Sequence, residues 1–173
     1  MNYKPVAGQI WIVKTTVSFP DGHQEQLKLR PGQPHMVLLV RFDDDFEENP
    51  RSVANVFPIS KRWIFASPYD LTFAADTSPL EDVPLMIECW NPRPVLRANL
   101  LRPIAKLDSL ALRDLQYVRS CCLRGFEATQ LLQSSAYVGP ALALQDPRSQ
   151  FQKVEFARTN FLSDPVNMLC YDM

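Results

Sequence analysis

The sequence contains little of what most metal sites and nucleophilic active sites are built from. Among its 173 residues only two are histidines and four are cysteines, and the cysteines form no Cys-x-x-Cys pair. A zinc site would have to be assembled from scattered residues, so we expect neither a metal nor any other cofactor. Cys121 and Cys122 are adjacent and have apolar neighbours, which favours reduced, buried thiols over a disulfide.

Long hydrophobic runs and a dominant charge are also missing. No segment approaches the roughly 20 apolar residues that span a bilayer, and residues 1–5 lack the apolar core of a secretory signal. The formal net charge is −1, which gives no global attraction for nucleic acid but leaves room for a local basic patch. We therefore expect a cytoplasmic protein with no membrane partner.

Glycine is scarce while proline is abundant, with five residues of the first and fifteen of the second. Proline blocks the interior of helices and of central strands, so it marks strand ends, sheet edges and loops. This composition predicts many short strands joined by stiff connections. It argues against a long helical bundle.

Strand patterns occupy the first part of the chain. Residues 9–19 alternate and are rich in β-branched and aromatic side chains, and the turn Pro20-Asp21-Gly22 leads to a polar edge strand at 24–29. The continuous apolar run in 35–42 predicts a strand that is buried on both faces or lies in a barrel interior. Further strands are expected at 53–59, 63–66, 69–73, 84–90 and 95–104. Together these segments indicate a small antiparallel barrel.

Helical spacing begins after the last of these strands. Apolar residues from Leu110 to Leu123 recur at a helical period, Asp108 or Ser109 is placed to cap the start, and Gly125 is placed to end the helix. The tail shows a shorter helical pattern at 126–136, a possible strand at 153–156 and otherwise no clear period. We therefore predict a mainly β, α+β chain: a barrel with its helix over residues 1–124, and an irregular extension over 125–173 that packs on the barrel or on a partner.

Six short motifs occur in a fixed order along the chain. They are Gly8-x-Ile10-Trp11, Gly22-x-x-Glu25, the strand Pro34 to Val40, Val56-x-Pro58-Ile59-Ser60, Leu100-Leu101-Arg102-Pro103-Ile104, and the helix start Leu107-Asp108-Ser109. Over about residues 6–124, this order resembles the MazF/PemK family of toxin endoribonucleases. The resemblance implies an SH3-like barrel, a homodimer, an antitoxin protein as partner, and cleavage of single-stranded RNA without a metal.

The resemblance also assigns a catalytic pair. In that family an arginine beside the proline that opens the third strand assists the reaction, and a threonine after a Pro-Ile pair is its partner. Ser60 holds the threonine position and keeps a hydroxyl. The residue directly before Pro34 is Gln33, whereas the Arg-Pro pair starts at Arg30, three residues earlier. The resemblance thus assigns Arg30 and Ser60 as catalytic residues, and Lys61, Arg62, Gln33 and Glu25 as RNA-binding residues.

The displaced arginine leaves two functions open. When the 2′-hydroxyl of RNA attacks the adjacent phosphate, the reaction needs a base, an acid and a positive charge that stabilises the developing phosphorane. Arginine supplies a charged planar fork for phosphate oxygens, whereas Gln33 carries no charge. The chain is therefore either an active endoribonuclease that uses Arg30, or an inactive barrel that binds RNA or protein. Gln33, the weak net charge and the long tail, which is foreign to compact toxins, favour the second function. The tail could cover the RNA groove in cis as a built-in antitoxin, or act as a dimer arm.

Each candidate residue also has a purely structural interpretation. Arg30 can be an exposed charge of the hairpin, and Glu25, in an edge strand, can simply face solvent. Ser60 can cap the backbone at a strand end, and Lys61 and Arg62 can be ordinary solvated charges. His35, ahead of an apolar strand, is typical of a core or edge histidine. Two further groups have two interpretations each. The tryptophans Trp11, Trp63 and Trp90 can stack on RNA bases or pack in the core or a dimer interface. The series Arg93, Arg97 and Arg102 can line an RNA groove or form the polar face of an outer strand.

Overall fold

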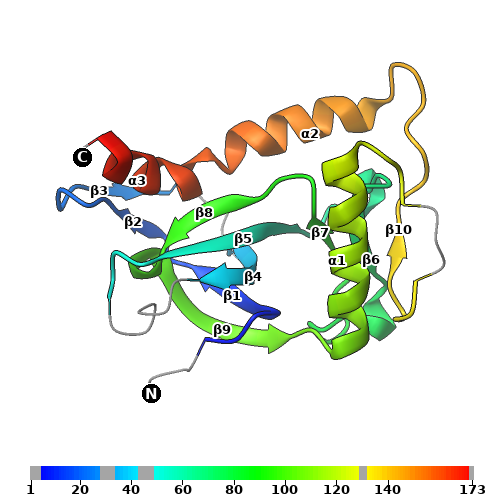
Figure 1. The fold of residues 1–173 in the computed structure, drawn as a ribbon, viewed down its shortest axis with the longest axis horizontal. Helices are drawn as coiled ribbons and strands as arrows, with labels where there is room; N and C mark the ends of the chain where they lie inside the picture. The colour runs from blue at the N-terminus through cyan, green and yellow to red at the C-terminus, as the bar shows by residue number, and fades with distance from the viewer. Residues whose placement is uncertain (1–4, 28–33, 43–48, 129–131, 172–173) are drawn as a thin grey trace.

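The computed structural model describes residues 5–27, 34–42, 49–128 and 132–171. Short antiparallel strands dominate its first part, and helices dominate its last part (Figure 1). The strands are β1 (Gln9–Val13), β2 (Thr16–Ser18), β3 (Gln24–Gln26), β4 (Met36–Phe42), β5 (Val53–Ser60), β6 (Asp70–Phe73), β7 (Leu85–Glu88), β8 (Arg93–Leu96), β9 (Leu100–Lys106) and β10 (Tyr137–Val138). The α-helices are α1 (Ser109–Arg124), α2 (Pro147–Arg158) and α3 (Asn160–Tyr171).

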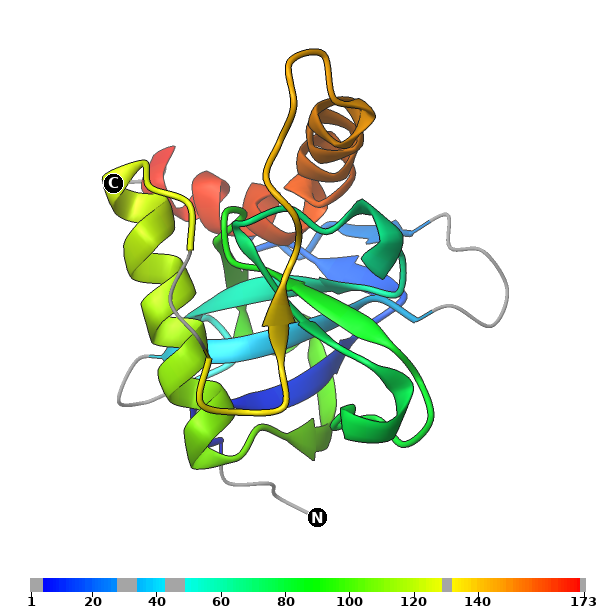
Figure 2. The same cartoon turned by 90° about the vertical axis from the view of Figure 1, so that its right-hand side faces the viewer.

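The main sheet is antiparallel throughout and has the order β10-β6-β7-β5-β4-β1-β9, with β8 also paired to β5. Strands β2 and β3 form a separate two-stranded sheet. Figures 1 and 2 show the strands curling around a common interior instead of lying in one plane. The predicted mainly β, α+β class is confirmed. No described helix is long and apolar enough to cross a membrane.

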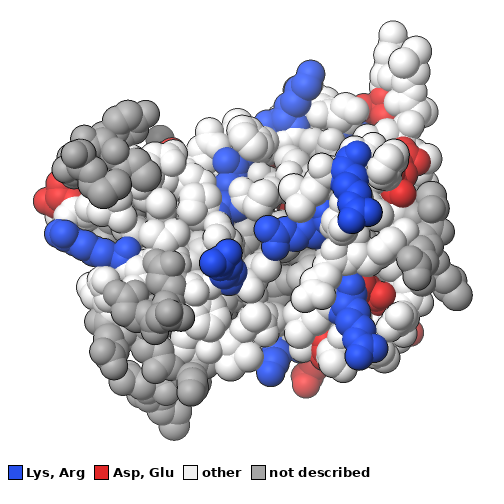
Figure 3. Space-filling model, viewed as in Figure 1, with Lys and Arg blue, Asp and Glu red and all other residues white. Residues whose placement is uncertain are grey.

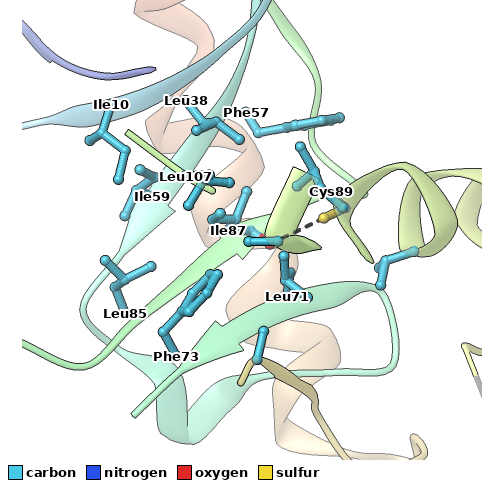
Figure 4. Packing of buried hydrophobic residues seen from close by; sticks show 14 of the residues in the cluster. Ile10, Leu38, Phe57, Ile59, Leu71, Phe73, Leu85, Ile87, Cys89 and Leu107 are labelled. Atoms are coloured by element: carbon cyan, nitrogen blue, oxygen red, sulfur yellow. Dashed lines mark hydrogen bonds between the residues drawn. The ribbon is translucent and has the colours of Figure 1, made fainter. Parts of the chain in front are cut away.

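Side-chain alternation gives the sheet two buried faces. Ile10, Leu38 and Phe57 point into one hydrophobic cluster (Figure 4), while their chain neighbours Trp11 and Val37 point into another. Successive residues of a strand point to opposite faces, so a strand buried on both sides reads as a continuous apolar run. The prediction made for the strand at 35–42 is therefore confirmed. Helix α1 covers the first face, and Leu162 of α3 packs on the second.

Helix α1 begins and ends where its sequence indicates. The Asp108 carboxylate accepts a hydrogen bond from the Ala111 N–H at 2.7 Å, which satisfies one of the free donors of the first turn. Gly125 adopts the left-handed conformation with φ of 70° and donates to the carbonyls of Cys121 and Cys122. The helix buries Ala111, Leu115 and Val118 against the sheet.

The extension differs from its sequence prediction, because it is largely helical and not irregular. Residues 153–156, predicted as a strand, lie inside α2, which starts at Pro147 behind an Asp146 cap. The described part of 126–136 is not helical. There the Asp114 carboxylate accepts hydrogen bonds from the N–H groups of Gln133 and Ser134, at 2.9 and 2.6 Å, and β10 follows. Helix α2 turns the polar Glu155 inward, so no apolar period marks it in the sequence.

Three strand predictions also need correction. The strand pattern at 9–19 forms two strands, β1 and β2, which lie in separate sheets. Residues 63–66 do not continue the sheet, because Trp63–Phe65 forms a 3-10 turn. The strand predicted at 95–104 is split into β8 and β9 by a second 3-10 turn, Arg97–Asn99. The buried Asn99 side chain causes the break: it accepts from the Ser18 N–H at 2.7 Å and donates to the Ser18 carbonyl at 3.1 Å, tying the turn to β2.

The extension packs on the strands at several places. Figures 1 and 2 show α2 and α3 following one another along one side of the sheet, with α3 beside β8 and the β2–β3 hairpin. In addition, β10 pairs with β6. The boundary between residues 1–124 and 125–173 stays a prediction.

Candidate functional site

Ser60, the predicted catalytic hydroxyl, is the last residue of β5 and only 4 % exposed. Its Oγ accepts a hydrogen bond from the Arg62 N–H at 3.1 Å, a strand-end contact with the backbone. Lys61 and Arg62 follow directly and are exposed to solvent. The two other residues predicted to act beside Ser60, Arg30 and Gln33, lie in 28–33, outside the described residues.

The start of β4 lies beside the end of β5. Met36 pairs with Ile59, so the next step of the same register brings His35 next to Ser60. On its other side, Ser60 pairs with Met86 of β7. The described residues just before β4, Pro34 and His35, therefore lie at the strand end where Ser60 sits.

Glu25, the remaining predicted RNA contact, lies away from this strand end on the separate β2–β3 sheet. It is exposed and pairs with His23, with 3.5 Å between Glu25 Oε1 and His23 Nε2. Its negative charge also reaches α3: partial desolvation, followed by repulsion from Glu25, raises the pKa of Asp164. The structure thus places Glu25 and Ser60 in different sheets.

The face of the sheet that carries Ser60 is covered by the two C-terminal helices. Ile59 and Ile87 point into the cluster under α1, so their neighbours Ser60, Met86 and Glu88 point to the other side. There Phe151 of α2 packs with Met86, and the ring of Phe161 in α3 lies 4.8 Å from the His35 ring. Ser60 lies on this face and is itself buried.

A buried polar cluster joins the same face to the helices. Asn91 Nδ2 donates to Glu88 Oε2 at 2.9 Å and lies 3.2 Å from Thr159 Oγ1. Arg93 Nε donates to the same Thr159 oxygen at 3.2 Å, and its Nη2 donates to the Phe156 carbonyl at 2.7 Å. All of these side chains except Phe156 are at most 7 % exposed. The helices are thus held by directed hydrogen bonds as well as by apolar contact.

Burial controls protonation in this cluster. It raises the pKa of Glu88 to about 8, with the Asn91 hydrogen bond opposing and Glu155 adding to the shift, so the Glu88 carboxyl is mostly neutral at pH 7. Glu155 is paired with Arg158, with 2.6 Å between Oε2 and Nη2. Among the described residues, Glu88 Oε1, Asn91 Oδ1 and Ser163 Oγ are buried without a hydrogen-bond partner.

His35 is not poised to exchange protons near neutral pH. Burial and the nearby positive charge of Arg158 lower the pKa of its imidazole to about 4. It is therefore neutral at pH 7 and a weak base. The structural interpretation of His35 agrees with this environment.

The arginines of the segment 93–102 do not share one groove. Arg93 is 7 % exposed, with its guanidinium 3.9 Å from the centre of the Phe156 ring. Arg97 lies over the Trp11 ring at 5.3 Å, while Arg102 is exposed on β9. The three arginines therefore lie in different environments, and Arg93 hydrogen-bonds to the C-terminal helices.

A pocket opens on another part of the surface, between the C-terminal end of α1 and the turns before β6 and after β7. It has a volume of about 320 Å³ and is lined mostly by apolar atoms. Its lining residues include Tyr69, Trp90, Arg119 and Cys122. Figure 3 shows Lys and Arg side chains across the middle of the face that carries α1, β5 and β8, with most acidic side chains nearer its margins.

Sequence reasoning missed both the polar cluster and the pocket. The one available hint for the cluster was a charged residue, Glu88, inside the apolar segment 84–90. For the pocket, the sequence offered only Trp90, as one of three tryptophans that could contact RNA, since the other lining residues come from distant segments. Among the described residues, no group of three or more His, Cys, Asp or Glu side chains is arranged to hold a metal ion.

Comparisons with known proteins give structural similarity only. No protein-family model and no curated protein matches the sequence. Among solved structures, Mycobacterium tuberculosis toxin MazF-mt6 is similar with a TM-score of 0.47 and 15 % identity, covering 67 % of this chain and 96 % of that one. An endoribonuclease in complex with its cognate antitoxin, from a mycobacterial species, is similar with a TM-score of 0.44 and 12 % identity, covering 70 % of this chain and 96 % of that one.

Proposed function

We propose that this protein is a MazF/PemK-like toxin of a toxin–antitoxin system that cleaves single-stranded RNA without a metal. The carrying observation is the pairing of Met36 with Ile59, which brings the end of β5, with the Ser60 hydroxyl, beside the chain entering β4. Arg30 lies a few residues upstream on that chain. A hydroxyl and a guanidinium converging at this strand end would supply the polar contacts and charge that the chemistry needs.

Each residue has a defined part in this proposal. Arg30 stabilises the phosphorane with its charged fork, and the Ser60 hydroxyl positions the phosphate. Lys61 and Arg62, both exposed directly after Ser60, bind the flanking phosphates. Gln33 donates a hydrogen bond but carries no charge, and Glu25 contacts the RNA at a distance from Ser60, from the separate β2–β3 sheet. The active species is a homodimer in the cytoplasm that an antitoxin protein inhibits.

A second candidate function is a catalytically inactive barrel that binds RNA or protein. The observation in its favour is the burial of Ser60, which is 4 % exposed on a face that α2 and α3 cover. A hydroxyl in this state reaches no phosphate. The two candidates therefore differ in whether α2 and α3 ever leave this face.

The first experiment is incubation of the full-length protein with a single-stranded RNA in EDTA. Cleavage by the wild type, reduced about 100-fold or more in Arg30→Ala, is the expected result, because removing one transition-state donor typically costs 10²–10³ in rate. Lys153→Ala is the matched control, since it removes one exposed positive charge from α2. Cleavage unchanged in Arg30→Ala would refute the assigned site.

A second experiment separates a covered nuclease from an inactive barrel. Phe151 is 7 % exposed and stacks on Phe65 at 4.7 Å, so Phe151→Ala loosens α2 while leaving Ser60 and Arg30 in place. Cleavage that appears or rises in Phe151→Ala supports the covered nuclease. RNA binding without cleavage in both proteins supports the binding module.

A further inference from the structure

We infer that the pocket beside Tyr69, Trp90 and Arg119 binds one nucleobase of a single-stranded RNA. This inference rests on the proposed function, because it names an RNA contact outside the catalytic centre. The pocket measures about 320 Å³, at the lower end of the range for small-molecule sites. That size suits a single base with its ribose.

The indole of Trp90 is held in a fixed orientation at the pocket. Its Nε1–H donates to Asp70 Oδ1 at 3.0 Å. Asp70 is 1 % exposed and is itself fixed by the Ser67 N–H and hydroxyl, at 2.8 and 2.6 Å. Because the polar edge of the indole is bonded to a buried carboxylate, its apolar surface is left to line the pocket. A ring fixed before binding loses little entropy when a base stacks on it.

The rest of the lining is apolar and uncharged apart from one cation. Cys89 and Cys122 carry neutral thiols, since burial raises the pKa of Cys122 to about 12 and that of Cys89 well above its usual value. The Cys122 thiol is directed to the Tyr69 carbonyl, 3.7 Å away. Arg119 adds a guanidinium, which lies 5.7 Å from the centre of the Phe57 ring. Aromatic and guanidinium planes are the groups on which unpaired bases stack.

The charge of the surrounding surface favours RNA as the occupant. Helix α1 exposes Arg113, Arg119 and Arg124, and Figure 3 shows further basic side chains across the same face. The whole chain has a net charge of −1, so this concentration is local. Phosphates on either side of a bound base would meet these cations, and the base would fill the pocket. A paired base in a duplex does not present its ring for such stacking, which selects a single strand.

The pocket is separate from the proposed catalytic centre. Cys89, at the pocket, belongs to the hydrophobic cluster under α1, whereas Ser60 points to the opposite face. RNA binding at the pocket is therefore measurable apart from cleavage. An aromatic side chain of a peptide is the competing occupant, and its binding would not depend on phosphate.

The test compares full-length variants by fluorescence anisotropy with labelled ten-nucleotide oligouridine and oligoadenosine RNAs in EDTA, on ice to suppress cleavage. Arg119→Ala is compared with Arg113→Ala, which removes the same charge from the same helix outside the pocket. We expect Arg119→Ala to weaken binding about fivefold more than Arg113→Ala. Trp90→Leu should weaken it at least fivefold, matching the lower range of base–aromatic stacking of about 1 kcal/mol, and Trp90→Phe should restore it.

A crosslinking arm locates the contact directly, even where a Trp90 variant unfolds. The wild type is irradiated with 5-bromouridine RNA, and crosslinks are expected at Tyr69 or Trp90. If Arg119→Ala and Arg113→Ala lost RNA affinity equally and the crosslinks lay elsewhere, the pocket assignment would be overturned while the nuclease proposal stayed intact. Binding that depends on the pocket without any cleavage would instead overturn the nuclease proposal alone. Binding of an aromatic peptide but not of RNA would overturn the choice of occupant.

Discussion

The neutral, buried carboxyl of Glu88 makes the stability of this protein depend on pH in a defined window. Its pKa is about 8 in the folded chain against 4.5 for the unconstrained side chain. Above pH 4.5 the unfolded chain gives up this proton, while the folded chain keeps it until about pH 8. Stability therefore falls as pH rises through this range, by about 1.36 kcal/mol for each pH unit.

The interval from pH 6.5 to 8 isolates this effect. The lowered pKa of His35, about 4, destabilises the fold mainly as pH falls below 6.5 and contributes only a few tenths of a kcal/mol above it. Asp70, with a pKa raised to about 6, is mostly ionised above pH 6.5. The raised pKa values of Cys89 and Cys122 act only above pH 8. Across the interval, the wild type should lose about 2 kcal/mol of unfolding free energy through Glu88.

Glu88→Gln is the matching perturbation. Glutamine keeps the shape and the oxygen that accepts from Asn91, but it cannot ionise. Urea unfolding of both proteins at pH 6.5, 7.25 and 8 measures the difference. The free energy of the variant should stay level while that of the wild type declines. Parallel curves for the two proteins would show that Glu88 is not held neutral and would refute the reasoning.

Three further changes test the fold around the proposed sites. Gly8→Ala and Gly22→Ala should each destabilise by about 1 kcal/mol in thermal unfolding, because φ is +86° at Gly8 and +90° at Gly22. A Cβ at Gly8 would lie 2.8 Å from Leu112 Cδ2, the movable end of a side chain, so a much larger loss at Gly8 than at Gly22 would contradict this reasoning. Asp108→Ala should cost about 1 kcal/mol through loss of the α1 cap, with Asp108→Asn nearly neutral in urea unfolding. Phe151→Ala should lower the free energy of unfolding by about 3 kcal/mol. Amide hydrogen exchange should become faster in α2 while α1 keeps its protection, and equal acceleration in both helices would contradict a local release of α2.

Much of the fold was predictable because its determinants are local. The strands β1, β4 and β5 follow from alternation and apolar runs between breakers. Helix α1 follows from its period, the Asp108 cap and the glycine at 125. Each of these features is set by side chains a few residues apart, so a single sequence contains them.

The errors arose where a distant partner decided the local conformation. The turn at 97–99 exists because Asn99 bonds to the backbone of Ser18. The stretch after α1 is not helical where described, since Asp114 holds the backbone of residues 133 and 134. Helix α2 was missed because it directs a carboxylate toward the sheet, where Arg158 pairs with it. No local pattern reports such contacts.

The sequence alone determined that this chain is mainly β, that its strands alternate around an apolar core, and that a Ser60 hydroxyl stands at the end of a core strand. Only the tertiary structure decided what that hydroxyl meets. It placed Ser60 beside the start of β4, turned it away from α1, and laid α2 and α3 over the same face. The physical reason is that alternation fixes which side chains share a face, whereas the groups that cover a face come from segments far apart in the chain.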